Sequence, residues 1–137
     1  MLTVIRQGAT GEKSGRSVGP YTGEIWRDIV HQDPEISVGS VYFTPCARSY
    51  WHTHPGGQLL IVVSGEGVVA DADGVIHMTV GDMVWTPPDV RHWHGATAER
   101  SVLNTVITYR GVEWQEEVTE SDYQAAVGQF TFTKSSA

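Results

Sequence analysis

The segment WHTHPGGQLLIVVSGEG, residues 51–67, predicts more about this protein than any other part of the chain. It begins with the pair His52 and His54, and a second segment, GDMVWTPPDVRHWHGA at residues 81–96, contains the pair His92 and His94. Residues two apart on a β-strand point to the same face of a sheet. Each pair is therefore expected to present two imidazoles on one face.

The sequence around these segments has the pattern of short β-strands separated by glycine-rich turns. We expect strands at residues 21–31, 35–44, 59–63, 67–71, 75–80, 91–94 and 101–110. The continuous apolar run at 59–63 suits a strand that is covered on both faces. Many short strands with regularly spaced turns indicate an all-β sandwich or barrel.

The length of 137 residues is typical of one domain, so we expect a single domain over 1–137. The barrel core should span about 21–110, after a loose N-terminal segment at 1–20. A short C-terminal helix is expected at 119–127, because Thr119 and Asp122 have the spacing of a capping box. Residues 128–137 should form a tail.

Charge and cysteine content narrow the class of protein. Sixteen acidic residues against nine basic ones give a net charge of −7, which disfavours nucleic acid and an anionic membrane as partners. The single cysteine, Cys46, allows no intramolecular disulfide. The N-terminus has no signal-peptide-like apolar stretch, and no aliphatic run is long enough to span a bilayer. These features fit a cytoplasmic protein.

The histidine pairs indicate a metal site. Gln58 follows His54 across the turn at residues 55–57, and a third imidazole from a distant strand would complete an inward-facing cluster. Imidazole binds zinc, iron, nickel, copper and manganese, and a carboxamide oxygen adds a neutral hard ligand. His31 and His77 stand alone in strands, and we interpret them as ordinary surface histidines or as core histidines whose hydrogen bonds are satisfied.

Both segments resemble the conserved motifs of the cupin superfamily. The residues that carry the resemblance are His52, His54, Gln58 and Gly65 in the first motif and Gly81, Pro87, Asp89 and His92 in the second. The resemblance implies a double-stranded β-helix (jelly-roll) barrel, one divalent metal ion held by His52, His54, Gln58 and His92, and a homodimer. Cys46 and Asp89 stand where cupins usually have glycine. We expect Cys46 to be a small buried residue and Asp89 to be a turn-tolerant substitute.

The run HWHGA at residues 92–96, with Trp85 before it, narrows the resemblance. It is similar to the small single-domain cupins that include manganese-dependent hydroxynitrile lyases and carboxymuconolactone decarboxylase-like proteins. In those lyases a histidine matches His94, and a further histidine stands at the place of Asn104. Asparagine can donate a hydrogen bond but cannot move a proton near neutral pH.

The ligand set predicts the type of chemistry. Three imidazoles and an amide leave the full +2 charge on the ion, which favours Lewis-acid chemistry over oxygen activation. His94 has three readings: a fifth ligand, a general acid or base beside the metal, or a residue that only orients ligands. We favour the acid–base role.

The strand at 101–110 places Asn104, Val106 and Thr108 on one face, which predicts that they face the metal cavity. Val41 and Phe43 are candidates for an apolar wall that would bind a hydrophobic small-molecule substrate. Arg48 is a candidate for binding an anionic group, although a structural ion pair is its commoner use.

We therefore expect a metal-dependent, lyase-like enzyme that acts on a small hydroxy or carbonyl compound. Manganese, iron or zinc, with nickel as a further option, would hold the substrate oxygen. His94 would move the proton and Asn104 would orient the leaving or attacking group. The alternatives are an aromatic polyketide cyclase with a four-histidine site, an iron-dependent dioxygenase and a non-enzymatic small-molecule-binding cupin. The exposed edge strand at 21–31 is the expected contact of the homodimer.

Overall fold

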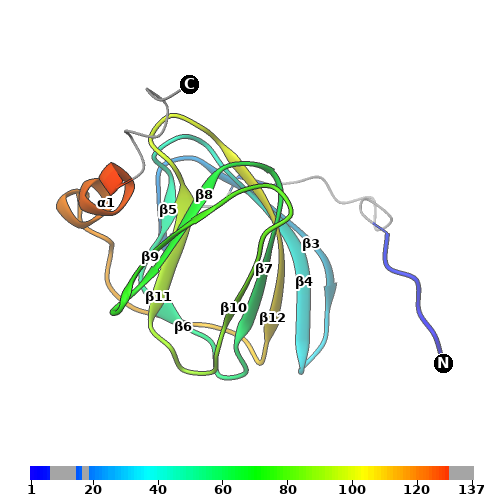
Figure 1. Ribbon diagram of the computed structural model, residues 1–137. Helices are drawn as coiled ribbons and strands as arrows, with labels where there is room; N and C mark the ends of the chain where they lie inside the picture. The colour runs from blue at the N-terminus through cyan, green and yellow to red at the C-terminus, as the bar shows by residue number, and fades with distance from the viewer. Residues whose placement is uncertain (7–14, 17–18, 130–137) are drawn as a thin grey trace.

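The computed structural model describes residues 1–6, 15–16 and 19–129, and the core of the protein is a barrel of two antiparallel sheets with one helix outside it (Figure 1). The all-β prediction with a short C-terminal helix is confirmed. The expected tail lies mostly outside the described residues, as does half of the N-terminal segment, and residues 15 and 16 of that segment form a strand.

The first sheet has the strand order β1-β3-β4-β12-β7-β10. Its members are β1 (Gly15–Arg16), β3 (Ile25–Gln32), β4 (Ile36–Phe43), β12 (Val102–Tyr109), β7 (Gln58–Gly65) and β10 (Met83–Thr86). The expected strand at 21–31 is two strands in the structure, because β2 (Tyr21–Thr22) belongs to the other sheet. The edge of β3 is paired by β1 over two residues.

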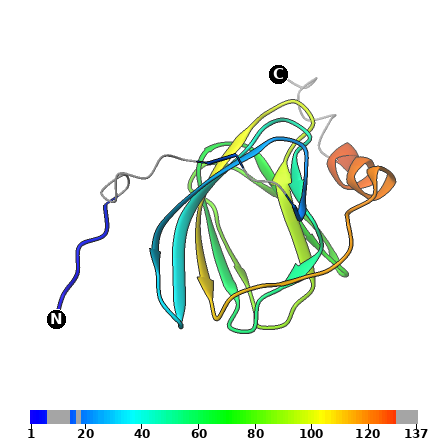
Figure 2. The ribbon, with the colours of Figure 1, turned by 180° about the vertical axis from the view of Figure 1, so that it is seen from behind.

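The second sheet has the order β13-β6-β11-β5-β2, with a hairpin of β8 and β9 attached to β11. Its further members are β13 (Glu113–Trp114), β6 (His52–Thr53), β11 (His92–Ala96), β5 (Arg48–Ser49), β8 (Gly67–Asp71) and β9 (Gly74–Met78). The segment after β12 passes across the lower part of the barrel before it reaches the helix (Figure 2). Backbone hydrogen bonds between Trp51 and residues 115 and 116 attach this segment to the second sheet.

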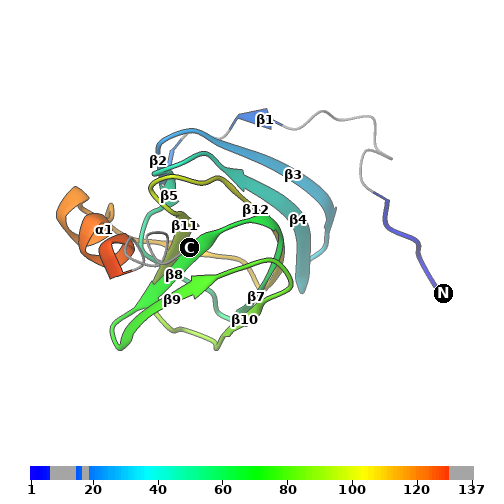
Figure 3. The ribbon, with the colours of Figure 1, turned by 45° about the horizontal axis from the view of Figure 1, so that its top comes forward.

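The predicted helix is α1 (Glu120–Val127). The Thr119 hydroxyl caps it by accepting a hydrogen bond from the backbone N–H of Asp122 at 3.1 Å, so the capping prediction is confirmed. Seen from above, α1 lies outside the barrel, beside β5 and β8 (Figure 3). Tyr123 attaches the helix to β11 by donating its buried hydroxyl to the Ala96 carbonyl at 2.7 Å.

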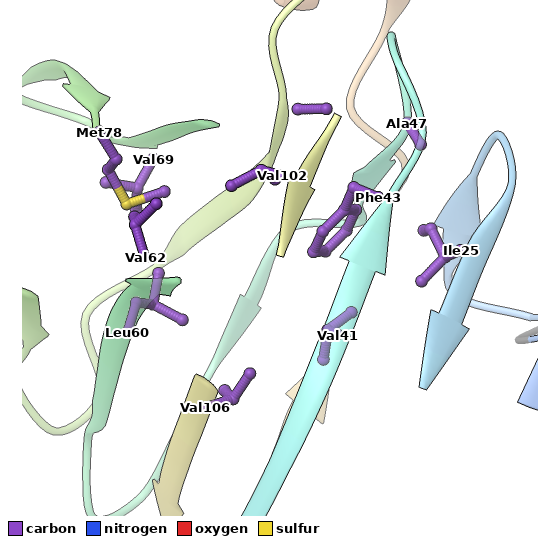
Figure 4. Close-up of a cluster of buried hydrophobic side chains, with 11 residues drawn as sticks. Ile25, Val41, Phe43, Ala47, Leu60, Val62, Val69, Met78, Val102 and Val106 are labelled. Carbon is purple, nitrogen blue, oxygen red and sulfur yellow. The ribbon is translucent and has the colours of Figure 1, made fainter. Parts of the chain in front are cut away.

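The main hydrophobic core fills the upper end of the barrel. Side chains from both sheets converge there, among them Phe43 of β4, Leu60 and Val62 of β7, and Val102 of β12 (Figure 4). All four are at most 2% exposed. The lower end of the same strands is not part of this core and can carry polar side chains.

Three local expectations are settled by the backbone and the burial. Cys46 has φ +71° and is exposed, so the expectation that it is buried is wrong; the left-handed conformation explains why glycine suits this position. Asp89 has φ +62°, which confirms the turn-tolerant interpretation. The run at 59–63 is fully covered on its inner face alone, because on the outer face Leu59 and Ile61 are half-buried and Val63 is 49% exposed.

Candidate metal centre

Three imidazoles meet at the lower end of the barrel. His52 of β6 lies directly opposite His92 of β11 in the strand register, and His54 follows β6 in the chain. One ring nitrogen from each of these histidines lies within 4.8 Å of the other two, and the side chains are 1–3% exposed. The cluster takes both histidines of the first His-x-His segment and one histidine, His92, of the second.

The orientation of each ring is fixed by a hydrogen bond to a backbone carbonyl. His52, His54 and His92 each donate Nδ1–H, to Tyr50 at 2.7 Å, Gly111 at 2.9 Å and Val90 at 3.0 Å respectively. A carbonyl oxygen can only accept, so the proton is on Nδ1 and the Nε2 lone pair is left for a ligand role. This is the tautomer that a metal site requires.

Gln58 of β7 adds an oxygen to the same point. Its amide Nε2 donates to the Thr108 hydroxyl at 2.9 Å, which turns Oε1 toward His92 Nε2 at 3.4 Å. Both of these atoms are acceptors, so they face each other with lone pairs and no proton between them. His54 Nε2 is also buried without a hydrogen-bond partner among the described residues. A bound cation would satisfy all three atoms, so the residues fit a divalent metal ion.

Burial keeps these histidines neutral, as ligation requires. Desolvation lowers the pKa of His52, and the neighbouring His94 and His92 lower it further. Desolvation also lowers the pKa of His54, and it lowers the pKa of His92 to about 4. The lone pairs are therefore available at neutral pH without competition from protons.

His94 lies beside this cluster rather than in it. Its ring stacks on His92 with the centroids 6.1 Å apart and meets Phe43 edge-on at 5.4 Å. Burial lowers its pKa well below the usual value. Its Nδ1 has no hydrogen-bond partner among the described residues. The structure thus presents a neutral imidazole, not engaged by protein groups at Nδ1, next to the candidate metal position.

A cavity of about 220 Å³ adjoins the centre. Val41, Val106 and Thr108 line it with His94, at the inward positions where the strand pattern places them. Sequence reasoning missed Tyr21, Arg27 and Trp114, which also line the cavity. At 21–31 the strand pattern identifies only the apolar residues. At 113–114 no local pattern predicts that β13 pairs with β6 beside His52.

Three residues expected in this cavity lie outside its lining. The Arg48 guanidinium donates to the Val118 carbonyl at 3.2 Å and to Glu120 at 3.1 Å, which are the contacts of a structural ion pair. Phe43 is fully buried in the core and supports His94 from behind. Asn104 is 0% exposed and does not border the cavity.

A larger hollow of about 340 Å³ lies between the β8–β9 hairpin and β10. Of the residues at the candidate metal centre, only His92 borders it. The convergent polar atoms and the neutral His94 are on the smaller cavity, which is therefore the candidate site.

The comparisons with known proteins agree with this geometry. The sequence pattern of the cupin domain matches residues 39–108. The chain is 38% identical over 112 residues to an (R)-mandelonitrile lyase of Granulicella tundricola, an alignment that covers 76% of this chain and 86% of that protein. The chain belongs to the cupin family.

Two solved structures extend the comparison. A cupin-like protein of Thermotoga maritima is 33% identical, with a TM-score of 0.78, and the match covers 90% of this chain and 96% of that one. A polyketide cyclase of Streptomyces resistomycificus is 10% identical, with a TM-score of 0.67 and 98% of both chains covered, and shares the fold alone. The described residues contain no helix long and apolar enough to span a membrane.

Proposed function

We propose that this cupin is a metal-dependent, lyase-like enzyme that acts on a small hydroxy or carbonyl compound. The proposal rests mainly on the contact between Gln58 Oε1 and His92 Nε2. These two acceptor atoms lie 3.4 Å apart with no proton between them, and a cation bound there would also be close to His52 and His54. The similarity to a mandelonitrile lyase supports this class of reaction.

A divalent ion held by His52, His54, Gln58 and His92 would polarise a hydroxyl or carbonyl oxygen of the substrate as a Lewis acid. All four donors are neutral, so the protein neutralises none of the ion's +2 charge. Manganese, iron and zinc all accept this donor set.

His94 is the proton carrier of the proposed reaction. In the cleavage direction its imidazole accepts the proton of the substrate hydroxyl. The bond between the hydroxyl-bearing carbon and its neighbour then breaks, a carbonyl forms, and the departing fragment leaves with the electron pair. His94 returns the proton to that fragment. A neutral imidazole has an acceptor nitrogen for the first transfer, and no described residue engages Nδ1 of His94.

The cavity walls position the substrate. Tyr21 and Trp114 meet edge to face with centroids 5.4 Å apart, and Trp114 lies 4.8 Å from the His52 ring. Val41 and Val106 add aliphatic surface to the lining. Such walls bind a flat or apolar body and exclude water from the reacting atoms.

The cyclase alternative requires His94 to be a ligand. In the described part of the chain, the histidines whose ligand atoms lie within 4.8 Å of one another are His52, His54 and His92. His94 is outside this group, which favours the acid–base role over a four-histidine site.

The variant His94→Ala tests the proposal. In protein loaded with one metal equivalent and assayed for aldehyde release from aromatic cyanohydrins, we expect metal content to be unchanged and kcat to fall by roughly 10²–10⁴-fold. His77→Ala, a change on the outer hairpin, should alter neither. Loss of metal in His94→Ala would instead support the four-histidine cyclase. Oxygen consumption with iron would support a dioxygenase, and tight binding without turnover a binding protein.

A further inference from the structure

The cavity beside the metal centre has one charged wall residue in the described part of the chain. Arg27 of β3 lines it, and neither aspartate nor glutamate does, although the chain has 16 acidic residues. The histidines and Gln58 are neutral, so the positive charge of Arg27 would add to that of a bound metal ion. The interior is therefore electropositive within a protein of net charge −7.

Arg27 also differs from four other arginines among the described residues. Arg48, Arg91, Arg100 and Arg110 each form an ion pair with a glutamate. Arg27 has no such partner among the described residues, and its side chain faces the cavity instead. An arginine that borders a cavity without a protein anion is a receptor for a ligand anion, because its planar guanidinium matches a carboxylate in two hydrogen bonds.

Tyr21 supplies a second donor beside it. It lines the same cavity, close enough to Arg27 for the guanidinium charge to lower the pKa of its phenol, but burial outweighs that charge and leaves the pKa raised. The hydroxyl therefore stays protonated and can donate. Its ring is held by Phe43 at 6.4 Å and Trp114 at 5.4 Å.

We propose that Arg27 and Tyr21 form a carboxylate-binding subsite, and that the substrate carries a carboxylate away from the oxygen that reacts. The assignment of the reacting oxygen rests on the function proposed above; the anion subsite itself does not. The cavity volume of about 220 Å³ suits a small aromatic or aliphatic acid.

Two matched probes test the subsite: 4-carboxybenzaldehyde and its uncharged analogue 4-carbamoylbenzaldehyde, with the 3-substituted isomers as a second pair. Calorimetric titration of metal-loaded protein should give at least about tenfold tighter binding of one or both carboxylates than of the matching amides. Arg27→Gln should remove this preference while leaving the amide Kd within about twofold. Because Arg27 is exposed to solvent in the cavity, raising the salt concentration should also reduce the preference.

Controls separate this inference from the lyase proposal. Arg100→Gln makes the same charge change on the outside of the barrel and should keep the preference. Tyr21→Phe should weaken carboxylate binding by a few fold more than it weakens amide binding, because a hydrogen bond to a charged acceptor is the stronger one. Protein treated with a chelator should retain the preference, since Arg27 is not a metal ligand. Equal affinity for the matched probes, or a preference that survives Arg27→Gln, overturns the subsite. Absence of turnover with a preserved preference refutes only the lyase function.

Discussion

The two ends of the barrel interior are built from the same strands but have opposite chemistry. Along β7 the inward positions run from Gln58 at the lower end to Leu60 and Val62 at the upper end. The neighbouring β12 runs in the opposite direction, from Val102 at the upper end to Thr108, which pairs with Gln58. The upper end is a dry hydrophobic core, and the lower end carries polar atoms directed at one point.

This difference shows how a small domain can hold a demanding site. The apolar end supplies the burial that stabilises the strands, at about 25 cal/mol per Å² of apolar surface. The polar end adds little stability of its own, but backbone carbonyls of Tyr50, Val90 and Gly111 fix its imidazoles. Stability and ligand geometry are therefore expected to respond to different substitutions, even on one strand.

Two substitutions on β7 give the largest expected separation. Leu60→Ala removes a fully buried side chain from the core and should lower the free energy of unfolding by about 2–5 kcal/mol, with metal stoichiometry unchanged. Gln58→Leu removes the oxygen donor and should weaken metal binding by more than about 100-fold. Losing a residue that only hydrogen-bonds to a ligand typically weakens it by about 10–100-fold. Urea unfolding of the metal-free proteins and competition with a metal chelator measure the two effects.

Gln58→Glu is the matched control at the lower end. It keeps an oxygen donor and adds a negative charge, so it should bind a divalent ion at least as tightly as the wild type while reducing the Lewis acidity of the ion. The proposed separation fails if Leu60→Ala loses metal or if Gln58→Leu binds it with unchanged affinity.

The pH dependence of the free energy of unfolding should also distinguish the two ends. The folded-state pKa of His92 is about 4 and that of the other clustered histidines is also lowered, against about 6.5 in an unfolded chain. Between these values the unfolded state binds more protons, so stability falls as pH falls. For His92 alone this amounts to about 3 kcal/mol between pH 6.5 and pH 4. Urea unfolding of metal-free protein at stepped pH values measures it.

The slope should depend on the lower end alone. His92→Asn should flatten the fall in stability, whereas Leu60→Ala should lower the whole curve without changing its slope. Carboxylates such as Glu120 titrate mainly below pH 5, so the interval from pH 6.5 to 5 reports the histidines. A metal-free protein whose stability is constant across that interval would contradict the burial argument.

The sequence predicts those features of the two ends that depend on local patterns, and not those that depend on which distant strands pair. The turn glycines and the two His-x-His segments are local patterns, so they predict the barrel and the residues that now meet at the candidate metal centre. The cavity walls depend on which strands become neighbours. Trp114 follows Tyr21 and Arg27 by more than 80 residues, and only the pairings of β2, β3 and β13 bring these three residues beside the histidines.

Strand periodicity also does not predict how far along the barrel axis an inward residue lies. Alternation correctly places Asn104 on the inward face of β12, but alternation cannot tell whether an inward residue lies in the cavity or in the core. Arg48 is a similar case, because its partners Val118 and Glu120 follow about 70 residues later in the segment leading to α1. Its role depends on the path of that segment, which no local pattern specifies.

Asn104 lies at the boundary between the two ends and gives the smallest expected effect. It is fully buried between Val102 and Val106, and neither atom of its amide has a hydrogen-bond partner among the described residues. A buried amide without partners costs about 1–3 kcal/mol, and valine suits an inward strand position. Asn104→Val should therefore raise the free energy of unfolding by about 1–2 kcal/mol in urea titrations.

The same variant decides to which end Asn104 belongs. If the residue is part of the dry core, Asn104→Val is more stable and turns over substrate at the wild-type rate, while Thr105→Val on the outer face changes stability by less than about 0.5 kcal/mol. If the variant loses both stability and activity, the amide has partners in the working protein, and the polar end extends one inward position higher along β12. That outcome would restore Asn104 to the catalytic site and make the cavity deeper than its described lining.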